Sequence, residues 1–334
     1  MAEDKGTLQS LYTANEAMGY TTELIEKRKA ESALVLRSGI ATMDRFVQPW
    51  LPGEQIVILA QTSHGKTAML QAMARNIVKQ IEQREDSKQV VVYASWETLV
   101  EELAVYDLAQ RTGLSGTSLW YGTYDALDGA AIREAGMKLA TRPLWYIGHS
   151  LKRRRGGSGM TVKALTETLR IMELEYGVTP AAIFIDYLQV LPAPPGLRDK
   201  RMEVIANMDA LRNLGRETGA PVVIAAQAGR DVSDRQDKLP EIGDGMESAR
   251  VEQDADKVLS LWYPCKTEAM GSVLPVYNLR VTQNLFLIRI CKQRRAESGQ
   301  VFPLYFEPSL NTFTTWHEDG PETGPVATEE DMPW

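Results

Sequence analysis

Residues 55–67, QIVILAQTSHGKT, are the stretch that decides the fold of this chain. A short apolar run at 56–60 stops at a small polar turn, and AMLQAMARNIV at 68–78 reads as a helix. A strand, a turn ending in Gly-Lys-Thr and a helix form the layout of a phosphate-binding loop for nucleoside triphosphates. The pattern expects glycine at its first position, where Ala60 stands, so an ordinary strand-turn-helix connection remains the alternative.

Phosphate binding accounts for the residue types in this turn. Backbone N–H groups would cradle phosphate oxygens, and the helix N-terminus would add partial positive charge. Gly65 lets the backbone approach closely, Lys66 would reach the β- and γ-phosphates, and the Thr67 hydroxyl would hold Mg²⁺. The sequence therefore predicts a nucleoside triphosphate and Mg²⁺ as ligands of the loop residues Thr62, Ser63, His64, Gly65, Lys66, Thr67 and Ala68.

Composition places the chain among globular proteins. Its 334 residues suit about two domains or one large α/β domain, and two cysteines form neither a disulfide framework nor a metal motif. The N-terminus lacks the apolar core of a signal peptide, and no apolar run is long enough to span a membrane, which predicts a cytoplasmic protein.

Net charge does not decide whether the chain binds nucleic acid. Residues 317–334 contain six acidic residues and no Lys or Arg, so removing their −6 from the total of −7 leaves the remainder at −1. A nearly neutral body can still carry a basic channel.

Apolar segments alternate with helical patterns along most of the chain. Near-continuous apolar runs predict strands at 55–60, 89–95, 143–147, 182–187, 221–226, 257–263 and 285–291, with shorter ones at 301–306 and 312–316. Helical patterns occupy 67–83, 97–111, 161–176 and 200–218. This alternation predicts an α/β fold with a mostly parallel, doubly wound sheet and antiparallel edge strands.

Residues 13–30 form a separate amphipathic pattern. Thr13 and Glu16 make a capping box, and Ala17, Met18 and Ile25 recur at helical spacing. Such a short helix must dock on its own domain or on a neighbouring subunit. We therefore expect an N-terminal helix within 1–36, an ATPase-like domain at 37–316 and an acidic, disordered tail at 317–334.

Two carboxylates follow expected strands, at the sheet edge where α/β proteins bind ligands. Asp186 ends the strand at 182–187 and could hold the Mg²⁺ shell, or it could cap a helix. Glu97 follows the strand at 89–95 and could polarise an attacking water, although it also suits the first turn of a helix.

Polar and basic residues end two further strands. Gln227 follows the strand at 221–226, with Arg230 close behind, and could sense phosphate or lie in solvent. Lys292 and Arg294 follow the strand at 285–291 and could neutralise a transferred phosphoryl group as an arginine finger does. A finger acting on a neighbouring copy would require an oligomer.

Six segments together resemble the DnaB-type hexameric replicative helicases. These are AQTSHGKT, SWET, IFIDYLQVL, VVIAAQAGR, ESARVEQDAD and ICKQRRAESG, in that order within residues 36–316. Members of that family commonly have alanine where Ala60 stands. The resemblance implies a RecA-like ATPase core.

The same resemblance implies roles for single residues. Lys66 and Thr67 would bind ATP and Mg²⁺, Glu97 would be the catalytic carboxylate, and Asp186 would be the Walker B carboxylate. Gln227 resembles the glutamine that couples to the γ-phosphate. Lys292 and Arg294 resemble the pair that reaches the neighbour's nucleotide, with Arg294 as the finger.

Three departures from the family pattern stand out. The family's N-terminal helical domain is not found in residues 1–36, which makes the usual primase coupling doubtful; the 13–30 helix resembles the family's linker helix. The loop expected to bind DNA, GDGMESAR, has Met246 before Glu247, Ala249 in place of glycine, and Arg250 nearby. A Gly-rich insertion at 150–160 could bind a nucleic-acid backbone or lie in solvent, and its basic residues are Lys152, Arg153, Arg154 and Arg155.

These features predict a ring-forming, ATP-dependent replicative DNA helicase, a homo-hexamer that translocates on single-stranded DNA. The alternatives are a RecA-like recombination ATPase and a non-translocating scaffold or regulatory ATPase. The C-terminal EEDMPW resembles the partner-binding tip of bacterial single-stranded-DNA-binding proteins, so Trp334 could dock a replication partner.

Overall fold

The computed structural model describes residues 12–30, 35–84, 87–152, 160–192, 196–197, 199–245 and 254–317. The chain divides into two compact units, Met1–Leu36 and Arg37–Trp334. The basic run at 153–155, the loop residues 246–250 and the acidic tail from 318 onward lie outside the described residues.

The N-terminal unit contains helix α2 (Ala14–Ala30), as the sequence predicts. The Thr13 backbone N–H donates to Glu16 Oε2 at 2.8 Å, and the Glu16 N–H donates to Thr13 Oγ1 at 3.2 Å. These two bonds form the expected capping box. Met18 and Ile25 are exposed within this unit.

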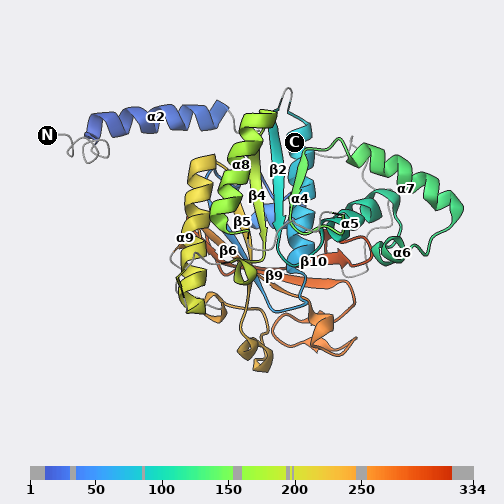
Figure 1. Cartoon of the computed structure of the whole chain (residues 1–334). Coiled ribbons are helices and arrows are strands. Elements are labelled where there is room, and N and C mark those ends of the chain that lie inside the picture. Colours follow the sequence, from blue (N-terminus) through green and yellow to red (C-terminus); the bar gives the residue numbers. More distant parts are fainter. Residues whose placement is uncertain are drawn as a thin grey trace. The chain divides into compact units, whose positions relative to one another are not determined.

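The larger unit is built on one nine-stranded sheet, in the order β11-β10-β9-β6-β1-β5-β4-β2-β3 (Figure 1). Neighbours from β3 to β6 pair in parallel, whereas β9, β10 and β11 add an antiparallel edge. The strands are β1 (Gln55–Ala60), β2 (Gln89–Ser95), β3 (Leu144–Ile147), β4 (Thr179–Asp186), β5 (Val222–Gln227), β6 (Lys257–Trp262), β9 (Leu285–Gln293), β10 (Val301–Glu307) and β11 (Thr312–Thr315). The predicted fold class is confirmed.

Helices cover the sheet because its central strands are apolar on both faces. Val57 and Leu59 pack with buried side chains of α8 (Val162–Tyr176) and α9 (Lys200–Thr218). Side chains alternate along a strand, so Ile56 and Ile58 face the other side. Helix α4 (Lys66–Glu82), which contacts β2, β4 and β5, lies on that side (Figure 1).

Several elements differ from the sequence-based prediction. Helix α5 (Val100–Thr112) begins three residues later than expected, because the Ser95 hydroxyl accepts the Thr98 N–H and Leu99 stays extended. Helices α6 (Gly116–Tyr121) and α7 (Ala126–Leu139) fill the stretch after it, and neither was predicted. A short helix α3 (Ala41–Phe46) precedes β1, and β7 (Val273–Leu274) pairs with β8 (Leu279–Arg280) in a hairpin between β6 and β9; none of these elements was predicted.

None of the helices in the described ranges has the length and apolar character needed to cross a bilayer.

Candidate functional site

The turn between β1 and α4 has a backbone that only glycine suits at one position. Gly65 has φ +79°, and a Cβ built on it would lie 2.8 Å from Cε2 of Phe286 on β9. A side chain there would meet both the left-handed backbone penalty and the aromatic ring. The turn is therefore held close against the sheet, with Lys66 and Thr67 opening α4.

Lys66 is held at the mouth of this turn. Its ammonium donates to the carbonyl oxygens of Ala60 at 3.0 Å and Gln61 at 2.9 Å. Burial lowers the pKa of Lys66 to about 8, while the nearby carboxylates of Asp186 and Glu97 act in the opposite direction. The structure thus brings together three residues that the sequence placed at or just after the ends of three different strands.

Asp186 ends β4 beside the turn and is almost fully buried. The hydroxyl of Tyr93 on β2 donates to its Oδ2 at 3.0 Å. Burial raises the pKa of Asp186 above its ordinary value, and hydrogen bonding by Thr67 and Tyr93 and the charge of Lys66 oppose this rise. A carboxylate and a hydroxyl at one point are the oxygen ligands that Mg²⁺ prefers, so Thr67 and Asp186 fit the predicted metal shell.

Glu97 lies in the loop after β2, outside α5, and is exposed. Its charge acts on Lys66, Asp186 and Tyr187. The alternative that Glu97 lies in the first turn of a helix is wrong, because α5 begins at Val100. An exposed carboxylate beside Lys66 and Asp186 could accept a proton from water.

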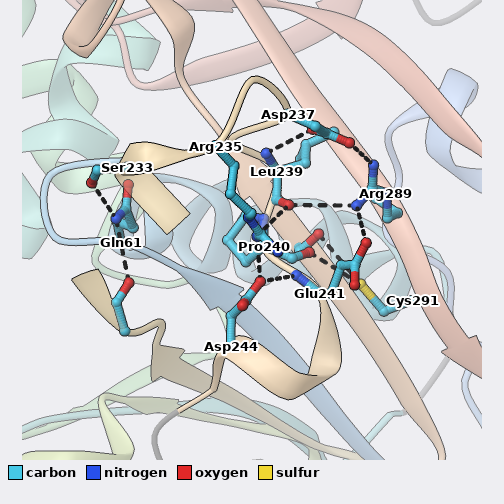
Figure 2. A network of polar contacts seen from close by, with 12 residues as sticks. Gln61, Ser233, Arg235, Asp237, Leu239, Pro240, Glu241, Asp244, Arg289 and Cys291 are labelled. Carbon is cyan, nitrogen blue, oxygen red and sulfur yellow. Dashed lines mark hydrogen bonds and ion pairs between the residues drawn. The ribbon is translucent and has the colours of Figure 1, made fainter. Parts of the chain in front are cut away.

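Gln227 is directly connected to the turn. It ends β5 opposite Ala60 of β1, and its Nε2 donates to Thr62 Oγ1 at 2.9 Å. The side chain is half-buried and ends the strand rather than lying in a loop. Gln61 makes a second connection, because its Nε2 donates to Ser233 Oγ at 2.8 Å and to the Gly229 carbonyl oxygen at 3.3 Å (Figure 2).

The segment 228–245 that follows β5 is internally braced. Its ends meet where the Gly229 N–H donates to the Asp244 carbonyl oxygen at 2.7 Å, and Arg235 forms an ion pair with Asp244 (Figure 2). Arg289 of β9 anchors the middle through an ion pair with Asp237. These contacts connect the two ends of the segment to each other and its middle to β9. The segment ends just before residues 246–250, the expected DNA loop, and of Arg230 only the backbone is described.

His64 has a structural role that sequence reasoning missed. Its Nδ1 accepts the backbone N–H of Tyr263, just after β6, at 3.1 Å. Burial lowers its pKa to about 4, with further lowering from Lys66 and Lys266. A neutral His64 therefore ties the turn to β6. Nothing in the sequence signals a partner 199 positions away.

Lys66 lies at the carboxyl ends of the parallel strands, whereas Arg294 lies at their amino ends, on the opposite side of the sheet along the strand direction. Arg294 follows β9, whose end pairs with the start of β6, and its Nη1 lies 3.2 Å from Asp256 Oδ1. The six residues of β1 separate the two edges by about 20 Å. A cavity of about 360 Å³ opens here, and its charged lining consists of Glu54, Asp256, Arg212, Arg216, Arg294 and Arg295. Lys292 lies within β9 and pairs in register with Val258.

Residues 35–315 match the family described as DnaB-like helicase C terminal domain. The chain belongs to this family. It is 27% identical over 281 residues to the replicative DNA helicase DnaC of Bacillus subtilis strain 168, which covers 83% of this chain and 55% of the relative. It is also 27% identical over 265 residues to a probable plasmid replicative DNA helicase of Chlamydia trachomatis, covering 78% and 51%.

The chain spans about half the length of the curated relatives it matches. Its fold resembles that of a separately solved ATPase domain, with a TM-score of 0.74, 21% identity, and coverage of 92% of this chain and 100% of that one. A solved DnaB-like replicative helicase gives a TM-score of 0.73 at 21% identity, covering 92% of this chain and 68% of that one. The region that matches the DnaB-like family, residues 35–315, includes Lys66, Thr67, Glu97, Asp186 and Gln227.

Proposed function

We propose that this chain hydrolyses ATP at sites shared between neighbouring copies in a ring, a hexamer, and uses hydrolysis to move along single-stranded DNA and separate duplex. One observation carries the proposal. The residues suited to bind and hydrolyse the nucleotide meet at one edge of the sheet, whereas Arg294 lies at the other edge, about 20 Å away. A finger at that distance can serve only the nucleotide of another copy.

The chain's own residues suggest a division of work. Lys66 would hold the β- and γ-phosphates, and Glu97 would take a proton from a water whose oxygen attacks the γ-phosphorus. The bond from that phosphorus to the bridging oxygen then breaks, leaving ADP and phosphate. Arg294 of the neighbouring copy would neutralise the developing charge. When bound, Mg²⁺ would supply further charge neutralisation, and Thr67 and Asp186 would hold it.

Gln227 and Gln61 suggest how the nucleotide state could reach DNA. Both side chains join the phosphate turn to β5 or to the braced segment 228–245 that follows it. A change at Thr62 or Gln61 on hydrolysis would therefore bear on the residues that lead into 246–250. Backbone groups of that loop could grip DNA phosphates.

The first test compares the ATPase rate with and without single-stranded DNA, beside unwinding of a forked duplex, at two salt concentrations. Stimulation with unwinding is expected, and the slope of affinity against salt would count phosphate contacts. Hydrolysis that ignores DNA and separates no duplex would favour a scaffold or regulatory ATPase instead.

The second test addresses the shared site. Arg294→Ala should abolish hydrolysis while leaving nucleotide binding intact. Mixing it with Lys66→Ala subunits should restore some hydrolysis, because each variant then supplies the group that the other lacks. Failure to restore activity at any mixing ratio would count against a site formed by two copies.

A further inference from the structure

Arg294 emerges from a cluster of acidic and basic residues at the starts of the parallel strands. The Arg294 side chain is 43% exposed, whereas that of its partner Asp256 is 13% exposed. A half-exposed arginine has many rotamers, so its direction depends on what holds its guanidinium. Among the described residues, Asp256 is a carboxylate that pairs with Arg294.

Asp256 is itself fixed by β1. Its backbone N–H donates to the Gln55 carbonyl oxygen at 2.8 Å, and its Oδ2 accepts the Gln55 N–H at 3.0 Å. Gln55 is the first residue of β1, the strand that leads to the phosphate turn. Asp256 is therefore attached to a fully buried strand of the sheet, through both backbone and side chain.

Asp256 holds Arg294 through two further contacts. The Arg294 N–H donates to the Asp256 carbonyl oxygen at 3.1 Å, and the Asp256 Oδ1 pairs with Arg294 Nη1 at 3.2 Å. The two carboxylate oxygens thus have separate partners: Oδ2 binds β1 and Oδ1 binds the guanidinium. Both the backbone and the guanidinium of Arg294 are therefore linked through Asp256 to the same strand, β1.

Other ion pairs lie beside this one. Glu54 pairs with Arg295 at 2.8 Å and also with Lys257. Asp254, two residues before Asp256, pairs with Arg212 at 2.6 Å. Asp254 is thus a neighbouring carboxylate with an ion pair of its own, which makes it a matched control for Asp256.

We propose that Asp256 is the positioning residue that orients Arg294 toward the nucleotide of the neighbouring copy. This inference rests on the proposed function, in which Arg294 completes a shared site. A guanidinium held in place before the reaction neutralises developing charge without reorganising, so its orientation affects the chemical step rather than nucleotide binding.

The isosteric variant Asp256→Asn tests this in the full chain. It keeps an oxygen for the Gln55 N–H but removes the charge that pairs with Arg294. We expect kcat for ATP to fall about tenfold with KM within about twofold, since misplacing a catalytic group acts on the transition state. Asp256→Glu should recover part of the loss, and Asp254→Asn should leave kcat within about twofold of wild type.

One further measurement separates positioning from general damage. In rings mixed with excess Lys66→Ala subunits, Asp256→Asn subunits should hydrolyse ATP as fast as wild-type subunits mixed at the same ratio. Their neighbours then supply a correctly held Arg294.

The outcomes distinguish this inference from the proposal beneath it. If Arg294→Ala hydrolyses ATP normally, the shared site itself is wrong. If Arg294→Ala is inactive but Asp256→Asn keeps the wild-type kcat, only the positioning role is wrong. A deficit that persists in the mixed rings would place the effect of Asp256 within its own subunit and would also overturn the positioning role.

Discussion

The buried ammonium of Lys66 makes nucleotide affinity depend on pH in a predictable direction. Burial lowers its pKa to about 8, so the free protein loses this positive charge as pH rises through 8. The Lys66 ammonium donates to the two carbonyl oxygens of Ala60 and Gln61, which add no negative charge. A bound triphosphate would add negative charge at the ammonium and raise the pKa, so binding above pH 8 must take up a proton.

The size of the expected change in Kd follows from the Lys66 pKa of about 8. With a pKa of about 8, about nine-tenths of the free protein carries the charge at pH 7 and about one-tenth at pH 9. If binding requires the ammonium, Kd should rise about tenfold between these two values, equivalent to about 1.4 kcal/mol. The phosphates themselves are already fully ionised over most of this range.

Isothermal titration calorimetry with a non-hydrolysable ATP analogue and Mg²⁺ measures both quantities. Titrations at pH 7, 8 and 9, each in two buffers of different ionisation enthalpy, report Kd and the number of protons taken up. Lys66→Arg is the control, because a guanidinium stays charged throughout and its Kd should be flat. A wild-type Kd that does not change between pH 7 and 9, without proton uptake at pH 9, would refute the reasoning.

Three other changes have expected outcomes. Asp107→Ala should lower the free energy of unfolding by about 3–5 kcal/mol in urea titrations, because it leaves the buried guanidinium of Arg75 without its carboxylate. The control Glu134→Ala breaks an exposed ion pair and should cost under about 1 kcal/mol. Equal losses for the two variants would contradict the importance of burial. Gly65→Ala should cost about 1–2 kcal/mol for its backbone alone and abolish nucleotide binding; retained binding would contradict the tight turn. Gln61→Ala should reduce stimulation of hydrolysis by single-stranded DNA while nucleotide affinity stays within about twofold; unchanged stimulation would remove its link to the 228–245 segment.

Sequence patterns predicted the sheet well because parallel strands buried on both faces read as continuous apolar runs. The ranges 55–60 and 89–95 coincide with β1 and β2, and 200–218 coincides with α9. Prediction failed where periodicity is weak. Helix α7 is largely exposed, with Leu127 and Met137 facing outward, so it shows no clear apolar stripe.

The motifs identified the side chains suited to phosphate chemistry, but they did not identify the residues that those side chains contact. Lys66, Asp186 and Glu97 could be proposed from strand ends, because the carboxyl ends of parallel strands meet at one edge. The contacts of Gln227 with Thr62 and of Asp256 with Arg294 join residues far apart in the chain. Such pairs carry no local sequence signal.

The sequence by itself therefore determined the strand-turn-helix unit at 55–83, the alternating α/β order and the residue types needed for phosphate chemistry. These depend on local periodicity and turn chemistry, which act over a few residues. Only the tertiary structure decided which groups meet: Lys66, Asp186 and Glu97 at one edge, with Arg294 held by Asp256 at the other. The strand order and register set those distances, because a sheet brings together residues that are tens to more than a hundred positions apart in the chain.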